Sequence, residues 1–109
     1  MSVAEAAWLA GFFDGEGSIS EFKGGRDYKY RTWKLSAPNT NRQSLEKCKT
    51  VTGVGGICVK YEKTKRRKKL WQWQLSAQRD IQKILLQMLP YLVIKKKKAK
   101  RFLKMFREI

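Results

Sequence analysis

The segment from Leu9 to Ser18 constrains the fold most strongly, because it combines small residues, glycines and two acids. Ser2 and Glu5 have the spacing of a capping box, and Gly15 and Gly17 follow, so a helix is predicted over residues 3–14. At 3.6 residues per turn, one narrow stripe of this helix carries Val3, Ala7, Ala10, Gly11 and Asp14. The opposite side carries Trp8, Leu9, Phe12 and Phe13. One side can therefore fill a hydrophobic core, while the other lets a second backbone approach closely.

Paired strands and helices alternate along the remainder of the chain. Alternating side chains predict strands over residues 19–23, 28–37, 57–62 and 70–75. Three further helices are predicted: one over residues 40–52 with a Thr40–Gln43 capping box, one from a Ser76 cap to about Leu89, and one from about Lys95 onward. Paired strands with helices between them are typical of the α+β class. We therefore expect one domain over residues 1–109 with a single four-stranded antiparallel sheet.

Charge indicates the class of partner. Lysine and arginine number 25 against 9 acids, which gives a net charge of +16. These cations are spread along the chain rather than gathered in a tail, so nucleic acid is the expected partner. The absence of histidine, with only Cys48 and Cys58 present, argues against a zinc site. Without a signal-peptide core or an apolar stretch of membrane-spanning length, the chain is expected to be soluble and intracellular, cytoplasmic or organellar, with no membrane partner.

Each predicted strand has one apolar face for the helices and one polar, basic or aromatic face that can enter a DNA major groove. The second face consists of Ser20, Phe22, Tyr28, Tyr30, Thr32, Lys34, Ser36, Lys60, Glu62, Gln72 and Gln74. A basic run predicts a loop that contacts backbone phosphates, namely Lys65, Arg66, Arg67, Lys68 and Lys69, and Lys96 is also expected to bind nucleic acid. An ordinary solvated sheet face and a nuclear-localisation signal are the alternatives.

Glu21 departs from this pattern. It is in phase with Ile19 and should point into the core, where an unpaired carboxylate is costly. Either a β-bulge after Ser20 shifts the phase of the strand, or Glu21 pairs with an internal cation. The sequence leaves both alternatives open.

The motif from Leu9 to Gly17 resembles the signature of the LAGLIDADG homing endonucleases, in the variant that ends Asp-Gly-Glu-Gly. Asn39-Thr40-Asn41 and the segment from Pro90 to Ala99 are similar to further segments of that family, and the element order resembles its αββαββα core. The resemblance implies a sheet that forms a DNA-binding saddle, and motif helices that pack against each other through their small faces. Since this chain carries one motif, it implies a homodimer with an interface at Ala7, Ala10, Gly11 and Asp14.

The resemblance also assigns roles to individual residues. Glu16 takes the position of the catalytic, metal-binding acid, and Gly15 the position that offers its backbone carbonyl to the metal. Lys97 aligns with the active-site lysine, and Asn39 is the candidate for positioning water, with Thr40 and Asn41 as alternatives. Asn41 could equally cap the helix that follows. Mg²⁺ is the expected cofactor, because hard oxygen ligands suit it; Mn²⁺ is expected to replace it, and Ca²⁺ to support binding without cleavage.

These roles imply a site-specific endonuclease that hydrolyses both strands of a long, near-palindromic DNA site. The alternative is a non-cleaving binder of the same fold, either an intron RNA maturase or a DNA-binding regulator. The presence of Glu16 and Lys97 favours the endonuclease, since a pure binder needs neither. Membership of a larger two-motif protein, of which this chain would be one half, also stays open.

Overall fold

The computed structural model describes residues 1–24 and 30–107. The helices are α1 Val3–Glu16, α2 Arg42–Thr52, α3 Gln78–Met88 and α4 Lys96–Arg107, with a short 3-10 helix, η2 Leu89–Tyr91, between the last two. The strands β1 Ser18–Gly24, β2 Tyr30–Asn39, β3 Gly56–Tyr61 and β4 Leu70–Leu75 form one antiparallel sheet in the order β1-β2-β4-β3. The predicted α+β class and order of elements are therefore confirmed.

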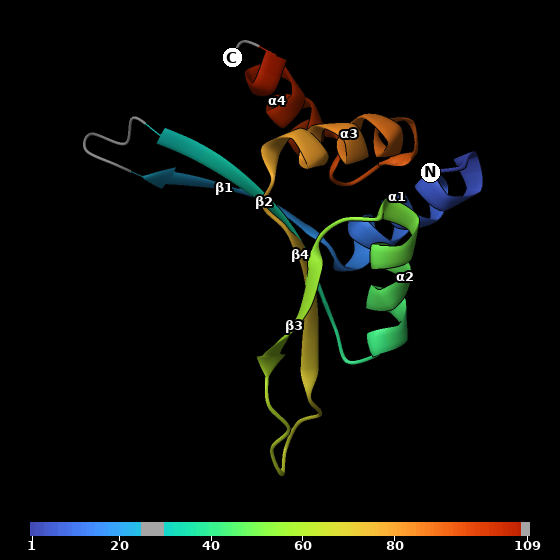
Figure 1. Cartoon of the computed structure of the whole chain (residues 1–109), viewed down its shortest axis with the longest axis vertical. Coiled ribbons are helices and arrows are strands. Elements are labelled where there is room, and N and C mark those ends of the chain that lie inside the picture. Colours follow the sequence, from blue (N-terminus) through green and yellow to red (C-terminus); the bar gives the residue numbers. More distant parts are fainter. Residues whose placement is uncertain (25–29, 108–109) are drawn as a thin grey trace.

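The helices lie together on one side of the sheet, and the β1–β2 and β3–β4 hairpins extend beyond them in different directions (Figure 1). Trp33 of β2 packs edge-on against Phe102 of α4, with ring centroids 5.4 Å apart. Trp73 of β4 packs in the same way against Phe13 of α1, at 5.9 Å. All four side chains are buried, so aromatic pairs fix the helices to the sheet, and the opposite sheet face is left for other contacts.

The pairing of β1 with β2 resolves the position of Glu21. The register runs without interruption from Ser18 opposite Ser36 to Gly24 opposite Tyr30, which excludes the alternative of a bulge. Glu21 instead pairs with cations, but Arg31 and Arg101 are about half exposed (45% and 55%) rather than internal. The Glu21 side chain is 12% exposed, and its Oε2 lies 3.1 Å from Nη2 of Arg101 on α4. Its Oε1 is buried without a hydrogen bond among the described residues, 3.8 Å from Nε of Arg31.

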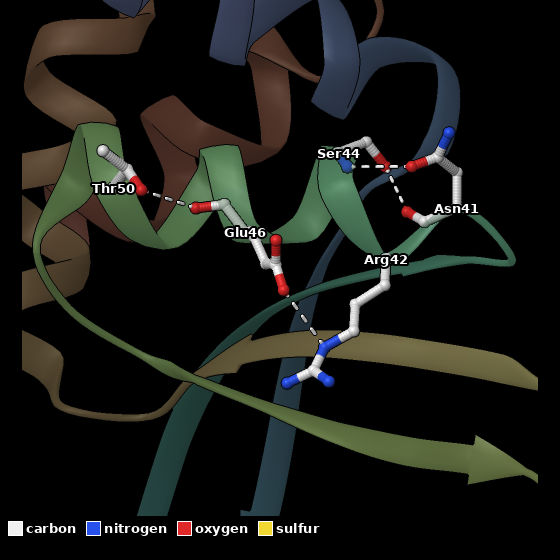
Figure 2. A network of polar contacts seen from close by, with 5 residues as sticks. All are labelled: Asn41, Arg42, Ser44, Glu46 and Thr50. Atoms are coloured by element: carbon white, nitrogen blue, oxygen red, sulfur yellow. Dashed lines mark hydrogen bonds and ion pairs between the residues drawn. The ribbon is translucent and has the colours of Figure 1, made fainter.

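Two predicted helix caps differ from the structure. The cap of α2 is Asn41 rather than Thr40, because the Asn39 Oδ1 accepts the Asn41 N–H at 2.8 Å and forms a turn that moves the helix start by one residue. The Asn41 Oδ1 then accepts the Ser44 N–H at 3.2 Å (Figure 2). At α3 the cap position is Ala77 rather than Ser76, without a side-chain cap. The Ser2–Glu5 capping box of α1 is present as predicted.

Gly17 joins α1 to β1, and a glycine is required there because a side chain would not fit, not because of its backbone conformation. Its φ of −86° is open to any residue. A Cβ built on Gly17 would, however, overlap the Phe13 ring and lie 2.8 Å from the Phe13 Cα. Because Phe13 is fully buried against the sheet, neither atom can move aside.

We therefore expect Gly17→Ala to lower the free energy of unfolding by about 2 kcal/mol through overpacking. Gly56→Ala is the matched control, because a Cβ on Gly56 in β3 meets nothing within 4 Å. Urea unfolding of both variants measures the difference. Equal stabilities would show that the turn after α1 has room for a side chain.

Candidate functional site

Glu16 is the last residue of α1 and is exposed, as is Gly15 beside it. Carboxylate and carbonyl oxygens are the hard ligands that Mg²⁺ prefers, so the chemistry of these two residues fits a divalent cation. Within residues 1–24 and 30–107, no group of three or more His, Cys, Asp or Glu side chains is placed to hold a metal. Glu16 and Gly15 are therefore not joined by a cluster of metal-ligating side chains within the described residues of one chain.

Asp14, two residues earlier, has a different role. Its Oδ2 accepts the Val93 N–H at 2.8 Å, and its Oδ1 accepts the N–H groups of Ile94 and Lys95, both at 3.0 Å. The Lys95 Nζ in turn donates to the Asp14 carbonyl oxygen at 3.0 Å. Both carboxylate oxygens are thus engaged within the subunit, and they fix the segment that leads into α4.

These hydrogen bonds control the ionisation of Asp14. Partial burial opposes the charged form, but the backbone N–H donors of Val93, Lys95 and Ile94 outweigh it and hold the pKa of Asp14 below its usual value. The carboxylate is therefore charged at neutral pH, when its hydrogen bonds are strongest.

Lys97 lies in the first turn of α4, directly after the segment that Asp14 fixes, and it is exposed. Neither Lys97 nor Glu16 makes a hydrogen bond or an ion pair within the described part of the chain, so both remain available for a ligand. Asn39, at the end of β2, uses its side-chain oxygen in the turn before α2. Its predicted role in positioning water stays a prediction.

The exposed side of α1 is rotated relative to the predicted stripe. Ala10 is fully buried in the core of its own subunit, Ala7 is half-buried, and Gly11 and Gly15 are exposed with nothing within 4 Å of a built Cβ. The outward face is instead Ala4, Gly11 and Gly15, about one residue further around the helix. The small residues of this face are joined by Val3, which is 70% exposed, and by the half-buried Trp8 one turn after Ala4. The expectation of a close approach to another backbone therefore stays a prediction for the C-terminal half of α1, at Gly11.

The sheet face away from the helices brings together most of the residues predicted to contact DNA. Across β1 and β2, Ser18 lies opposite Ser36, Ser20 opposite Lys34, and Phe22 opposite Thr32. Gln74 of β4 continues the first row, and its Oε1 accepts a hydrogen bond from Gln72 at 3.3 Å. Ser18 was missed from the sequence, although it alternates in phase with Ser20. Tyr28 and the side chain of Tyr30 lie outside the described residues.

The end of β3 does not follow the predicted alternation. Val59 pairs with Trp71 but Tyr61 pairs with Leu70, so the register shifts at Lys60. Tyr61 therefore shares the open face with Leu70 and Gln72, where alternation placed Lys60 and Glu62. A bulge leaves no local sequence signal, which explains why Tyr61 was missed.

The basic loop between β3 and β4 is partly held by aromatic rings. Arg67 stacks over Tyr61 at 4.5 Å, and Lys69 over Trp71 at 4.5 Å, while Lys69 also lies 3.9 Å from Glu62. Lys65, Arg66 and Lys68 are exposed, and Lys96 is half-buried at the start of α4. The loop thus presents cations on a fixed hairpin end, as contact with phosphates requires.

Two further findings concern membrane-spanning helices and the cysteine Cys48. In the part of the chain that the structure describes, no helix has both the length and the apolar character needed to span a bilayer. Cys48 is buried in α2, and this burial raises the pKa of its thiol to about 12. Cys48 is therefore a protonated core residue at neutral pH.

Comparisons with known proteins agree with this geometry. The sequence model of the LAGLIDADG endonuclease family matches residues 9–109. The fold is similar to that of the homing endonuclease I-CvuI, solved in complex with the I-CreI target, with a TM-score of 0.77 and 24% identity over 95% of this chain and 66% of that one. The fold is also similar to that of an archaeal intron-encoded homing endonuclease, I-Vdi141I, complexed with DNA. The TM-score is 0.74, and the identity is 21% over 91% of this chain and 64% of that one.

A third similar structure is the LAGLIDADG homing endonuclease I-GzeII in complex with its DNA target, with a TM-score of 0.75 and 26% identity. The match covers 99% of this chain but 38% of that one. This chain therefore spans about two thirds of the length of the first two relatives and less than half of the third. Curated protein sequences give no match.

Because Asp14 accepts three backbone hydrogen bonds, we expect Asp14→Asn to lower the free energy of unfolding by about 2 kcal/mol at pH 7. The lowered pKa means that this stabilisation is complete above the usual Asp value and is lost as the pH falls through the lowered one. The difference between wild type and variant, measured by urea unfolding, should therefore shrink in strong acid.

Glu46→Gln is the control, because the exposed Glu46 carboxylate pairs with Arg42 one turn earlier in α2, at 3.4 Å (Figure 2). Its effect should stay within about 0.5 kcal/mol. An Asp14→Asn effect no larger than that of Glu46→Gln would contradict the role given to Asp14.

Proposed function

This chain belongs to the LAGLIDADG endonuclease family, and we propose that it is a homing endonuclease that cuts a specific double-stranded DNA site as a homodimer. The observation that carries this proposal is the exposed Glu16 at the end of a helix whose last two turns expose only the small residues Gly11 and Gly15 before it. An acid in this position can meet its copy in a second subunit without steric hindrance.

The surface of the chain supports a duplex as the partner. The open sheet face offers amide, hydroxyl and lysine side chains, and Gln and Lys can form hydrogen bonds with base edges in the major groove. The net charge of +16 and the hairpin cations Lys65, Arg66 and Lys68 supply contacts to the phosphates on either side. The structures of I-CvuI, I-Vdi141I and I-GzeII contain DNA, which agrees with this partner.

The surroundings of α1 support a two-fold dimer. Val93 is 80% exposed, and Asp14 holds it beside the end of α1. Apolar side chains next to a face of small residues favour burial against a second copy. A two-fold axis that runs between the two copies of α1, parallel to them, would bring the two copies of Glu16 together. The same axis would match a near-palindromic DNA site.

Glu16, with the Gly15 carbonyl, would hold a divalent cation between the subunits. When bound, Mg²⁺ lowers the pKa of a coordinated water and neutralises charge on the scissile phosphate; we expect Mn²⁺ to replace it and Ca²⁺ to permit binding only. Lys97 would stabilise the negative charge that develops on the phosphate, and Asn39 would orient water through its amide group. Asp14 holds the segment before Lys97 in place through its hydrogen bonds to residues 93–95.

Selection of cleaved sites from a randomised duplex library in Mg²⁺ tests the reaction and reports the target. On that target, Glu16→Gln should abolish cutting while binding in Ca²⁺ stays at the wild-type level. Glu46→Gln, which removes an exposed acid from α2, should cut normally. Cutting by Glu16→Gln at the wild-type rate would remove its catalytic role, and wild-type binding without any cutting would favour a maturase or a regulator.

The homodimer makes a separate prediction. Gly11→Leu adds bulk to the exposed side of α1, where nothing lies within 4 Å, so the subunit should still fold. Sedimentation should give a dimer for wild type and monomers for Gly11→Leu. Gly11→Ala, with a single added methyl group and a similar gain in helix propensity, should dissociate less. A Gly11→Leu dimer as stable as the wild type would place the interface elsewhere.

A further inference from the structure

A groove of about 730 Å³ lies between α4 and β2, separate from the open sheet face. Arg31 of β2 forms one side, and α4 forms the other. Arg31 is two residues from Trp33, so both point to the same side of β2, and Trp33 is buried against Phe102 of α4. The groove therefore belongs to the helix-covered side of the sheet, whereas the proposed duplex surface lies on the other side.

Cations line this groove on both sides: Arg31, Lys97, Lys98, Lys100, Arg101 and Lys104. Along α4, Lys97, Lys100 and Lys104 recur once per turn, which spaces them by about 5.4 Å along the helix. A row of positive charges at such regular spacing suits an extended chain of phosphates better than a single small anion.

Only part of this charge is neutralised within the subunit. Glu21 lies behind the groove and binds Arg101 at 3.1 Å, with Arg31 at 3.8 Å. The four groove lysines form no ion pair with any residue that the structure describes. Glu21 thus holds the two arginines in position, and the lysines are left to attract an anionic ligand.

Apolar side chains complete the groove. Ile94, which is 72% exposed, and Met105 line it beside the cations. Apolar side chains beside the cations offer contact to the apolar faces of unpaired bases, which a duplex keeps in its stack. A volume of about 730 Å³ is sufficient for a few linked nucleotides.

We propose that the α4 groove binds a single-stranded segment of nucleic acid through its phosphodiester backbone, at a surface distinct from the open sheet face. The strand can come from RNA or from unpaired DNA, because the groove chemistry is directed at phosphates. The N-terminal end of the groove is formed by Lys97, so a strand bound there would run away from the proposed reaction site along α4.

Fluorescence polarisation with a short oligouridylate and a short oligothymidylate tests this site. Lys100→Gln/Lys104→Gln removes two groove charges and leaves Lys97, Arg31 and Arg101 intact. We expect about tenfold weaker binding of at least one oligonucleotide, and a salt dependence whose slope is smaller by about 1.4, as expected for two lost phosphate contacts. Unchanged polarisation with both oligonucleotides would overturn the proposal.

The matched control is Arg79→Gln/Lys83→Gln, which removes the same charge from the exposed side of α3. It should bind both oligonucleotides as the wild type does, and an equal loss would mean that only net charge matters, which also overturns the proposal.

A mixed-sequence duplex separates the groove from the open sheet face. Lys34→Gln/Gln72→Ala, which alters two side chains of the open face, should weaken duplex binding and spare the oligonucleotides, while the groove variant should do the reverse. Equal weakening of duplex and single strand by the groove variant would show one shared surface and contradict the proposal. If the wild type binds no duplex but binds the oligonucleotides through the groove, the proposed endonuclease is rejected and the groove proposal stands.

Discussion

The hydrogen bonds between Asp14 and the backbone of residues 93–95 connect the two segments that the proposed chemistry requires. They join the end of α1 to the start of α4, which lie 79 to 81 positions apart in the chain. Glu16 follows this contact by two residues on one side, and Lys97 follows Lys95 by two on the other. The Asp14 carboxylate accepts three N–H groups and so has a structural role. Glu16 is then the carboxylate of the motif that is available to bind a ligand.

Cationic side chains lie on both sides of the sheet, but in different surroundings. On the helix-covered side, the half-buried Glu21 pairs with Arg31 and Arg101 beside the lysines of α4. On the open side, polar side chains of β1, β2 and β4 face outward, and Lys65, Arg66 and Lys68 are exposed between β3 and β4. This β3–β4 hairpin extends beyond the helices (Figure 1). A chain with a net charge of +16 can thus present two cationic surfaces that differ in shape.

The features that the sequence predicts correctly are those encoded locally. The Ser2–Glu5 capping box and the alternation of β1, β2 and β4 need only neighbouring residues, and all are present. Features set by distant contacts were missed. Ala10 is buried because of how α1 packs on the sheet, and Tyr61 lies on the open face because of a bulge. Asp14 forms hydrogen bonds with residues about 80 positions later in the chain. For Glu21, strand alternation predicts the direction of the side chain correctly but not its partner, because Arg101 comes from α4.

The central claim is that two copies of Glu16 share a divalent cation while Asp14 stays within its own subunit. A crystal structure of the protein bound to its selected DNA site in Ca²⁺ tests this most directly. It should show α1 of two subunits in contact, Ca²⁺ between the Glu16 carboxylates, and Asp14 still bound to residues 93–95. Subunits bound apart from each other, or Asp14 released from that segment to bind the ion in place of Glu16, would contradict it.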